Sequence, residues 1–523
     1  MPDLTSGSGQ AGRNRSVESE VYTVQGDNSI GLISYTCQPI NLPSRRMFRP
    51  SRLSTIGCIA VLLAGCASYR PAPLSPAANA VALDSRTLDD PRLQHFVLAS
   101  LSSNREALPG PVWDLNKLTL AALYYHPDLE VARAKLAVSR AGIITAGQRP
   151  NPSLNFAAVF ASGAIPPGAI PLTIGPVVNF LIETFSKRQD RTAQARHLAE
   201  AAREDVATTA WQVRGRVRTA LLDLWAAQRR LDLERRQIGL RQQLVSLLQE
   251  RFTAGLATAL DLTRERIALA QTSLAIRDMS RLEAEARVQL ATAIGVPVRA
   301  LDDVKLSVTG FDHPAPPPAR MFTGALRHRA LTERTDVQAS LAQYAAAQSA
   351  LQLEIANQYP NLTLGPGYNY DTGLNKFILS PTIDLPIFNQ NQGQIAQAIA
   401  NRRQAAANLT ALQAQIIGAI DGAAAAYRTT TQSLATANSL LAAEDSRQRQ
   451  VRASFAAGET DRPTLVTTEL EQAVIRASQF DVLVLQRQAL GALEDALQQP
   501  IFDPNAALFG PRAGPRTTTE PSS

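Results

Sequence analysis

The most constraining feature of this sequence is a stretch of about 65 residues, from Ser186 to Glu250, that contains no proline. Within and just beyond it, apolar side chains recur every seven residues, at Val217, Leu224, Leu231, Ile238, Val245 and Phe252. Sustained seven-residue spacing predicts helices that supercoil against neighbouring helices. A helix of about 65 residues would span roughly 98 Å, which is too long for a compact domain. We therefore expect a mainly helical, elongated chain rather than one amphipathic helix on a globular core.

The same pattern occurs a second time, 203 residues further along the chain. The corresponding positions are Ile420, Tyr427, Leu434, Leu441, Gln448 and Phe455, of which five of six remain apolar. Two further matches lie upstream at an offset of 208, because Pro127–Leu129 resembles Thr335–Val337 and Pro152–Leu154 resembles Pro360–Leu362. The five-residue difference indicates one change in loop length between the inner ends of the strand pairs. The sequence therefore predicts an internal duplication. The predicted repeats are residues 111–312 and 321–500.

Each predicted repeat contains two segments that alternate between apolar and polar residues. These predicted strands are residues 153–162, 172–182, 361–371 and 376–386. Their alternating apolar residues are Leu154, Phe156, Ala158, Phe160, Leu172, Ile174, Val178, Phe180, Ile182, Leu362, Leu364, Tyr368, Tyr370, Phe377, Leu379, Ile383 and Leu385. Alternation over about ten residues suits a tilted strand of a membrane β-barrel. A soluble hairpin packed on helices would show the same pattern.

The number of strands helps to decide between these alternatives. Four strands cannot close a membrane barrel, because a barrel in lipid has no open edges and the smallest common one has about eight strands. The chain must therefore close with copies of itself or not span the membrane. Three copies would supply twelve strands.

The N-terminal part resembles a secretory leader. A short basic segment after Met47 precedes the apolar run Ile56–Leu63, which ends in Leu-Ala-Gly before Cys66. This is the pattern of a signal peptide over residues 47–65, and the run is too short for a spanning helix. The cysteine after Leu-Ala-Gly resembles the lipobox of bacterial lipoproteins, which predicts acylation, as by palmitate, at Cys66. An ordinary signal peptide followed by a chance cysteine is the alternative.

Segments rich in proline, alanine or glycine separate the predicted units. Residues 1–65 are the predicted leader, with translation expected to start at Met47. Residues 66–110 are expected to form a lipid-anchored tether. The proline-rich residues 313–320 are expected to link the two repeats as a stiff, extended stretch, and residues 501–523 to form a disordered tail.

Composition excludes several classes of function. Removal of the leader takes away Cys37 and Cys58 and leaves Cys66 alone, so neither an internal disulfide nor a thiolate metal cluster can form. The formal net charge of +7 is spread along the chain without a dense basic block, which argues against nucleic acid. No paired histidines, Gly-x-Ser-x-Gly motif or phosphate-binding loop is present. We therefore expect no catalysis, no cofactor and no metal site. His126, which precedes Pro127 at a predicted helix start, is expected at the surface.

Two glycines mark the places where the long helices should reverse. Gly255 and Gly458 end the two copies of the seven-residue pattern, and glycine provides the backbone freedom that a reversal needs. The predicted tips are Arg251–Thr258 and Phe455–Asp461. The simplest interpretation is that both glycines are helix caps.

The leader, the duplication, the two strand pairs and the long helices together resemble the TolC-like outer-membrane efflux proteins. The resemblance covers Asp114 to Gln499. Its local matches are His126–Ala134, Gly147–Leu154, Ile182–Arg188 and Pro386–Phe388. The second and third of these look most like the branch that serves heavy-metal cation pumps of the resistance-nodulation-division (RND) type.

That resemblance implies a homotrimer whose chains share a twelve-stranded β-barrel and a long periplasmic barrel of coiled-coil helices. Such a trimer would be a passive exit duct in the outer membrane of a Gram-negative bacterium. Its partners would be outer-membrane lipid, a periplasmic membrane-fusion adaptor and an inner-membrane RND-type pump. Adaptor docking would fall to the tip residues Arg251, Phe252, Gly255, Leu256, Phe455 and Gly458. Because Ser454 stands where the first copy has Arg251, the two tips are not expected to be equivalent.

An acidic residue beyond the first tip matches the family's aperture. A three-fold ring of Asp261 carboxylates at a constriction would select cations. The alternative is that Asp261 is a solvent-facing N-cap of the next helix. Glu459 and Asp461 are the corresponding candidates in the second copy.

The sequence leaves one close alternative function open and argues against two other classes of protein. A duct for type I protein secretion would use the same architecture. A periplasmic adaptor would have one helical hairpin between lipoyl-like β halves, and a structural coiled coil of the envelope would lack the strand alternation.

Overall fold

The computed structural model describes residues 69–101, 112–160, 162–163, 172–312, 324–371 and 374–501. Four predicted features lie outside these residues: the leader 1–65, the acylated Cys66, the linker 313–320 and most of the tail. Ser75 to Ile501 belong to one compact unit, and only this unit is described below.

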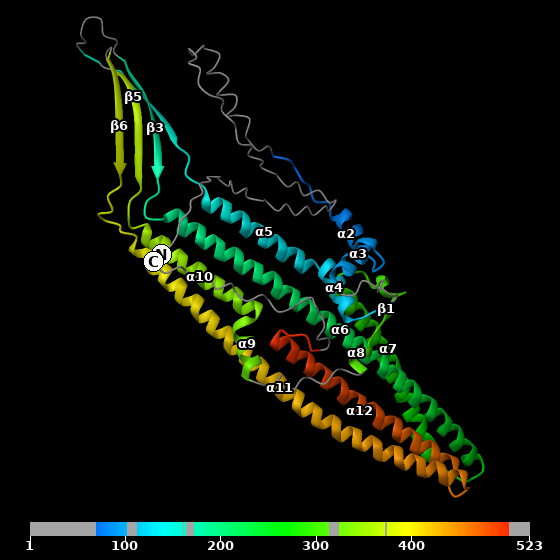
Figure 1. Ribbon diagram of the computed structural model, residues 1–523. Coiled ribbons are helices and arrows are strands. Elements are labelled where there is room, and N and C mark those ends of the chain that lie inside the picture. The colour runs from blue at the N-terminus through cyan, green and yellow to red at the C-terminus, as the bar shows by residue number, and fades with distance from the viewer. Residues whose placement is uncertain are drawn as a thin grey trace, which may run out of the picture. The chain divides into compact units, whose positions relative to one another are not determined.

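The chain forms long helices and one four-stranded sheet (Figure 1). In the first half the elements are α2 (Pro76–Asp84), α3 (Pro91–Ser100), β1 (Val112–Trp113), α4 (Leu115–Tyr125), α5 (Pro127–Gly147), β2 (Ser153–Phe160), β3 (Leu172–Ile182), α6 (Lys187–Thr253), α7 (Ala259–Ile294), η1 (Val298–Leu301), β4 (Lys305–Leu306) and α8 (Thr309–Asp312). In the second half they are α9 (Gly324–Glu333), α10 (Thr335–Ala356), β5 (Leu362–Asp371), β6 (Leu374–Ile383), α11 (Gln392–Ala456) and α12 (Arg462–Leu497).

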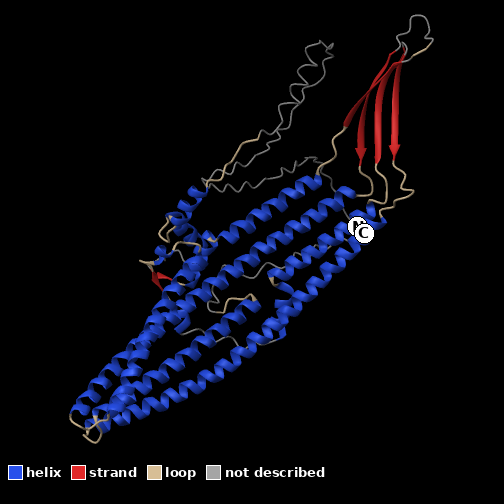
Figure 2. Cartoon of the chain, turned by 180° about the vertical axis from the view of Figure 1, so that it is seen from behind, coloured by secondary structure: helices blue, strands red, loops and turns tan. Residues whose placement is uncertain are grey.

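One order of elements occurs twice. A helix of 21 or 22 residues enters a strand pair, and a helix of 67 or 65 residues leaves it and reverses into a helix of 36 residues. The sheet lies at one end of these helices and both reversals lie at the other, as both views show (Figures 1 and 2). The long uninterrupted helix expected from Ser186 to Glu250 is confirmed as α6.

The loop lengths correct one detail of the predicted repeat. Eleven residues separate β2 from β3 but only two separate β5 from β6. Conversely, four residues join β3 to α6 and eight join β6 to α11. The five-residue change in offset is therefore the net result of two opposite changes, and the prediction of one changed loop is wrong.

Strands β2, β3, β5 and β6 form an antiparallel sheet in the order β2-β3-β5-β6, and β1 and β4 form a separate parallel pair. The pairings Leu154 with Val178, Phe180 with Leu364 and Tyr368 with Phe377 place all the predicted apolar positions within the strands on one face of the sheet. The opposite face carries mostly small and polar residues. The predicted alternation is thus confirmed, although β2 ends at Phe160 and β6 runs from Leu374 to Ile383 rather than from 376 to 386.

The seven-residue seam holds in the middle of α6, which runs from Lys187 to Thr253. Val217, Leu224 and Leu231 are buried there. Beyond them the buried positions shift by one residue, to Gln237 and Leu244. The neighbours change at this point, since Leu244 packs against Val466 and Leu470 of α12 in a separate cluster.

The main core lies midway along α6, where α4, α7 and α12 pack against it and α3 packs on α4. Leu88, Leu93 and Val97 are fully buried in this core. The prediction that residues 66–110 form only a tether is therefore wrong for α2 and α3, which begin at Pro76 and Pro91 with Ser75 and Asp90 as side-chain caps. Ile501, placed in the predicted tail, is buried in the neighbouring cluster with Leu493 and Leu497.

Among the described residues, one helix is long and apolar enough to cross a membrane by length and composition, and that is α11. One such helix is weak support for a membrane span, because core helices pass the same test. α11 packs along α12 and α10.

Candidate functional site

The first helical reversal is a Schellman cap. Gly255 adopts φ +71°, and its N–H donates to the Phe252 carbonyl (3.0 Å). The N–H of Leu256 donates to the Arg251 carbonyl (2.8 Å). These two bonds satisfy carbonyls that the end of α6 would otherwise leave unpaired.

The second reversal repeats the first bond for bond. Gly458 has φ +77° and donates to the Phe455 carbonyl (3.1 Å), while Glu459 donates to the Ser454 carbonyl (2.9 Å). The prediction that both glycines cap long helices is confirmed.

The helices that leave the two tips are capped by the same two residue types in opposite order. At α7 the Thr258 oxygen accepts the Asp261 N–H (3.1 Å), and its hydroxyl donates to the Asp261 carboxylate (2.6 Å). At α12 the Asp461 carboxylate accepts from the Thr464 N–H (2.9 Å) and hydroxyl (2.5 Å). The N-cap reading of Asp261 is therefore wrong, because Thr258 holds that position and Asp261 lies in the first turn.

An ion pair joins the two tips. Arg251 Nη2 lies 2.6 Å from Asp461 Oδ2, and both side chains are partly exposed. Hydrogen bonds from Thr464, and then the Arg251 guanidinium, lower the pKa of Asp461 to about 2. Both views show the two reversals side by side (Figures 1 and 2). The tips are thus linked by a carboxylate that stays ionised at neutral pH. The expected difference between the two tips in docking stays a prediction.

A polar groove of about 430 Å³ lies just above the tips. It is lined by Leu244, Leu248, Asp261, Arg264, Glu265, Arg447, Pro463, Thr464, Thr467, Thr468 and Glu471. Ion pairs hold its walls: Arg447 binds Glu471 and lies 2.8 Å from Glu444, and Arg241 lies 3.4 Å from Glu265. The groove can therefore offer both signs of charge to a partner.

The remaining predicted tip residues differ in their exposure to solvent. Leu256 is 76% exposed and Phe252 is 41% exposed, whereas Phe455 is half-buried. Asp261 and Glu459 are exposed. The apolar surface at this end of the chain is therefore concentrated on the first tip.

Sequence reasoning missed Thr258 and Thr464. The signal was present, because the 203-residue offset aligns Thr258 with Asp461 and Asp261 with Thr464. The Arg251–Asp461 pair was not predicted either, since it joins residues 210 apart and no local pattern reports such a contact.

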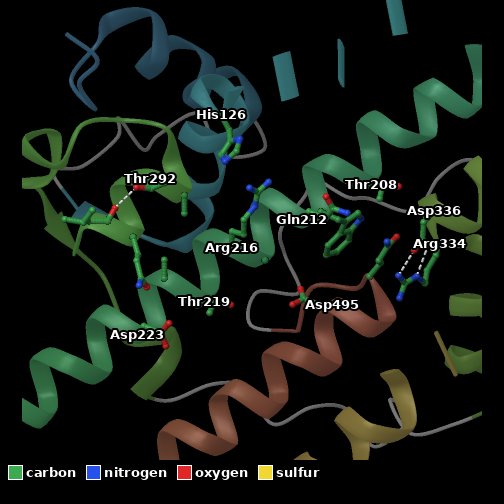
Figure 3. A pocket seen from close by; sticks show the side chains of 17 residues that line it. His126, Thr208, Gln212, Arg216, Thr219, Asp223, Thr292, Arg334, Asp336 and Asp495 are labelled. Carbon is green, nitrogen blue, oxygen red and sulfur yellow. Dashed lines mark hydrogen bonds and ion pairs between the residues drawn. The ribbon is translucent and has the colours of Figure 1, made fainter. Parts of the chain in front are cut away.

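A larger cavity of about 840 Å³ lies midway along the helices, away from the tips (Figure 3). It is lined by His126, Thr208, Trp211, Gln212, Gly215, Arg216, Thr219, Ala220, Asp223, Val288, Gln289, Thr292, Ala293, Arg334, Asp336, Asp495 and Gln498. His126 is only 7% exposed, so the prediction of a surface residue is wrong. It caps α5 by accepting the Asp128 N–H (3.2 Å), and burial, followed by the Arg216 charge, lowers its pKa.

Across the described ranges, no three His, Cys, Asp or Glu side chains gather in a way that could hold a metal ion.

Comparisons with known proteins agree with this architecture. The sequence model described as "Outer membrane efflux protein" matches residues 119–296. The cobalt-zinc-cadmium resistance protein CzcC of Cupriavidus metallidurans is 26% identical over 297 residues, which cover 56% of this chain and 68% of the relative. The pyoverdine export outer membrane protein OpmQ of Pseudomonas aeruginosa is 26% identical over 301 residues, or 53% of this chain and 62% of that protein.

The fold also has a solved counterpart. The outer-membrane channel OprN superposes with a TM-score of 0.61 at 19% identity, covering 84% of this chain and 99% of that one. At this identity the likeness supports the fold, and the sequence matches support the family. Over residues 119–296 the chain is therefore similar in sequence to the outer membrane efflux proteins.

Proposed function

We propose that the chain is one subunit of a homotrimeric outer-membrane efflux channel, a passive exit duct for ions or small molecules delivered by an inner-membrane pump and a periplasmic adaptor. The observation that carries this proposal is the four-stranded sheet, which has one apolar face. Among the described residues, its outer strands β2 and β6 each pair on one side only. A sheet in lipid needs every edge paired. Three copies would close it as a barrel of twelve strands.

The repeated element order supports the trimer on the periplasmic side. If the chain arose by internal duplication, its two long-helix pairs are equivalent building blocks, and three chains would contribute six of them to a helical barrel. The six reversals would then form a ring, with Gly255 and Gly458 alternating around it.

The exposed apolar side chains of the first tip support an adaptor-docking role. Leu256 and Phe252 offer apolar surface next to the charged groove, and central apolar anchors with a polar rim are typical of protein interfaces. We propose that docking uses the predicted tip residues of both copies and that an RND-type pump is reached through the adaptor.

Efflux, rather than protein secretion, is favoured by the relatives. One is described as a metal resistance protein and the other as a pyoverdine exporter. We propose cationic cargo, supported by the exposed carboxylates of Asp261 and Glu459 at the tips. Deletion of the gene is expected to cause hypersensitivity to heavy-metal cations; unchanged metal tolerance with lost siderophore export would point to the other cargo.

Lipid anchoring at Cys66 remains a proposal from the sequence, as does the Gram-negative outer membrane as its site. Metabolic labelling with palmitate tests the anchor, because Cys66→Ser should lose the label.

The channel and its aperture can be tested together in planar bilayers. The wild-type trimer is expected to conduct with a preference for cations. Asp261→Arg should weaken that preference, because it replaces three carboxylates near the constriction with three guanidinium groups. Asp278→Arg, on the exposed face of α7 and away from the tip, is the matched charge reversal. Unchanged selectivity in Asp261→Arg would remove Asp261 from the aperture, and an absence of any conductance from wild-type protein would refute the channel.

A further inference from the structure

One sequence motif occurs in both central strands of the sheet. Strand β3 contains Gly175-Pro176-Val177-Val178-Asn179, and β5 contains Gly365-Pro366-Gly367-Tyr368-Asn369. These are the two strands that join the hairpin of the first half to the hairpin of the second. Glycine and proline are both unfavourable inside central strands, so their recurrence here calls for a physical reason.

The register brings the two motifs into a local two-fold arrangement. Val177 pairs with Gly367. Counting two residues either way along the antiparallel pair places Gly175 opposite Asn369 and Asn179 opposite Gly365. All six residues project from the face opposite the apolar one.

Each of the three glycines is covered by the side chain opposite it. A β-carbon on Gly365 would lie 2.7 Å from Asn179 Oδ1, and one on Gly367 would lie 2.7 Å from Val177 Cγ2. A β-carbon on Gly175 would collide with the Asn369 amide. The two asparagine side chains therefore lie flat across the neighbouring strand instead of standing away from the sheet.

The prolines explain why the strands can approach in this way. The ladders β2–β3 and β5–β6 are continuous past Pro176 and Pro366, whereas the pairing of β3 with β5 is interrupted beside both. Proline has no N–H to donate, so both missing donors belong to the β3–β5 seam. The seam is thus held by packing of amides on glycines where backbone bonds are absent.

We propose that these glycine–asparagine pairs set the clearance of the β-barrel lumen, and hence the largest solute that can leave through it. The inference rests on the proposed trimer, in which the apolar face meets lipid and this face lines the pore. Each chain contributes two such pairs, and three chains would line the barrel with flat amides. A side chain at Gly365 or Gly175 would force the facing asparagine upright into the lumen.

Exclusion of neutral polymers tests this, because polyethylene glycols added on the barrel side of a bilayer report the width of that entrance separately from the periplasmic aperture. Gly365→Ala should shift the polymer cut-off to smaller sizes. Gly365→Ala with Asn179→Ala should return it toward wild type, since no amide remains to be displaced. Gly422→Ala, on α11 where a β-carbon meets open space, should leave it unchanged.

If Gly365→Ala does not assemble, the polymer cut-off of Asn179→Ala alone still tests the inference. A flat amide takes up little of the lumen, so its removal should leave the cut-off unchanged, and a shift to larger polymers would overturn the inference. Conducting Gly365→Ala trimers with the wild-type cut-off would overturn it too. Failure of the wild-type protein to form any channel would count against the proposed trimer instead.

Discussion

Asp461 has two structural roles, because it stabilises the start of α12 and also links the two tips. It caps α12 through Thr464 and pairs with Arg251 on the other tip. The cap acts within one helix, whereas the ion pair restrains two helical hairpins against each other. A substitution that removes only one of these contacts separates the two roles.

Asp461→Asn is that substitution. Asparagine is as good an N-cap as aspartate, but it carries no charge for Arg251. A partly exposed pair contributes only about 0.2–1 kcal/mol, so the fold should survive. If the pair helps to close the aperture, single-channel conductance in bilayers should rise in Asp461→Asn. Wild-type conductance in the variant would remove the pair from gating.

The pH dependence of the same pair follows from the depressed pKa of Asp461. Its folded pKa of about 2 lies below the ordinary aspartate value of 3.8. The stabilisation is therefore complete above the unfolded value and is lost as pH falls through about 2. The pair should consequently persist at every physiological pH, and wild-type conductance should not rise between pH 7 and pH 5 on its account.

His126 gives the same sign of pH dependence as Asp461, but at a higher pH. Burial and Arg216 lower its folded pKa below 6.5, so the unfolded chain binds the proton more readily. Its contribution to stability is complete above pH 6.5 and is lost as pH falls from there toward the folded pKa. The apparent heat-unfolding temperature should fall over this range, and His126→Asn, which can still cap α5, should reduce the fall. An equal pH dependence in both proteins would contradict the assignment.

At the scale of elements, a buried charge cluster joins α6 of the first half to α12 of the second. Glu494, Arg214 and Arg218 are 0%, 1% and 3% exposed. Arg214 binds Glu494, and Arg218 lies 3.1 Å from Glu494 and 2.6 Å from Asp495. Gly215 and Gly491 let these helices approach, because a β-carbon at Gly491 would lie 2.8 Å from Arg218.

Glu494→Gln should therefore destabilise the protein far more than an equivalent change at the surface. It leaves two buried guanidinium groups with one carboxylate less, and breaking a buried pair costs about 3–5 kcal/mol. Glu200→Gln, whose partner Arg203 is 63% exposed, should cost at most about 1 kcal/mol. Chemical denaturation of the two variants checks this, and equal midpoints would show that the cluster does not hold α6 against α12.

The helices and strands also show which parts of the fold could be predicted from the sequence. The length of α6 and the alternation in all four strands were predictable, because each follows from a periodic pattern within one segment. The burial of Leu93 and Val97 was not predictable, since the cluster that they join is built mainly from residues of α4, α6 and α7, which are distant in sequence. The proline- and alanine-rich composition around Leu93 and Val97 gave no sign of this burial. The offset between repeats reported only the net change in loop length, so two opposite changes looked like one.

In the candidate site, too, local features could be predicted from the sequence and contacts between distant segments could not. Gly255 and Gly458 were identified because a helix cap is a local feature of the backbone. The Arg251–Asp461 pair and the amides lying on Gly175 and Gly365 depend on contacts between distant segments, and periodicity within one segment does not report such contacts.

At the scale of the whole molecule, the chain combines an open sheet with helices far longer than a compact domain needs. An exposed, apolar four-stranded sheet would aggregate in water. In the proposed trimer, closure with further copies would remove both the open edges and the exposed apolar face. It would also place the tips in a ring, where the proposed docking and gating could act together. The proposed channel therefore requires three chains to share one sheet.

Native mass spectrometry of the wild-type protein, extracted from outer membranes in mild detergent, measures that number directly. The expected result is a single species of three chains that resists dissociation until it is heated, because closing the barrel pairs every strand edge. A stable, folded species of one chain would contradict the account.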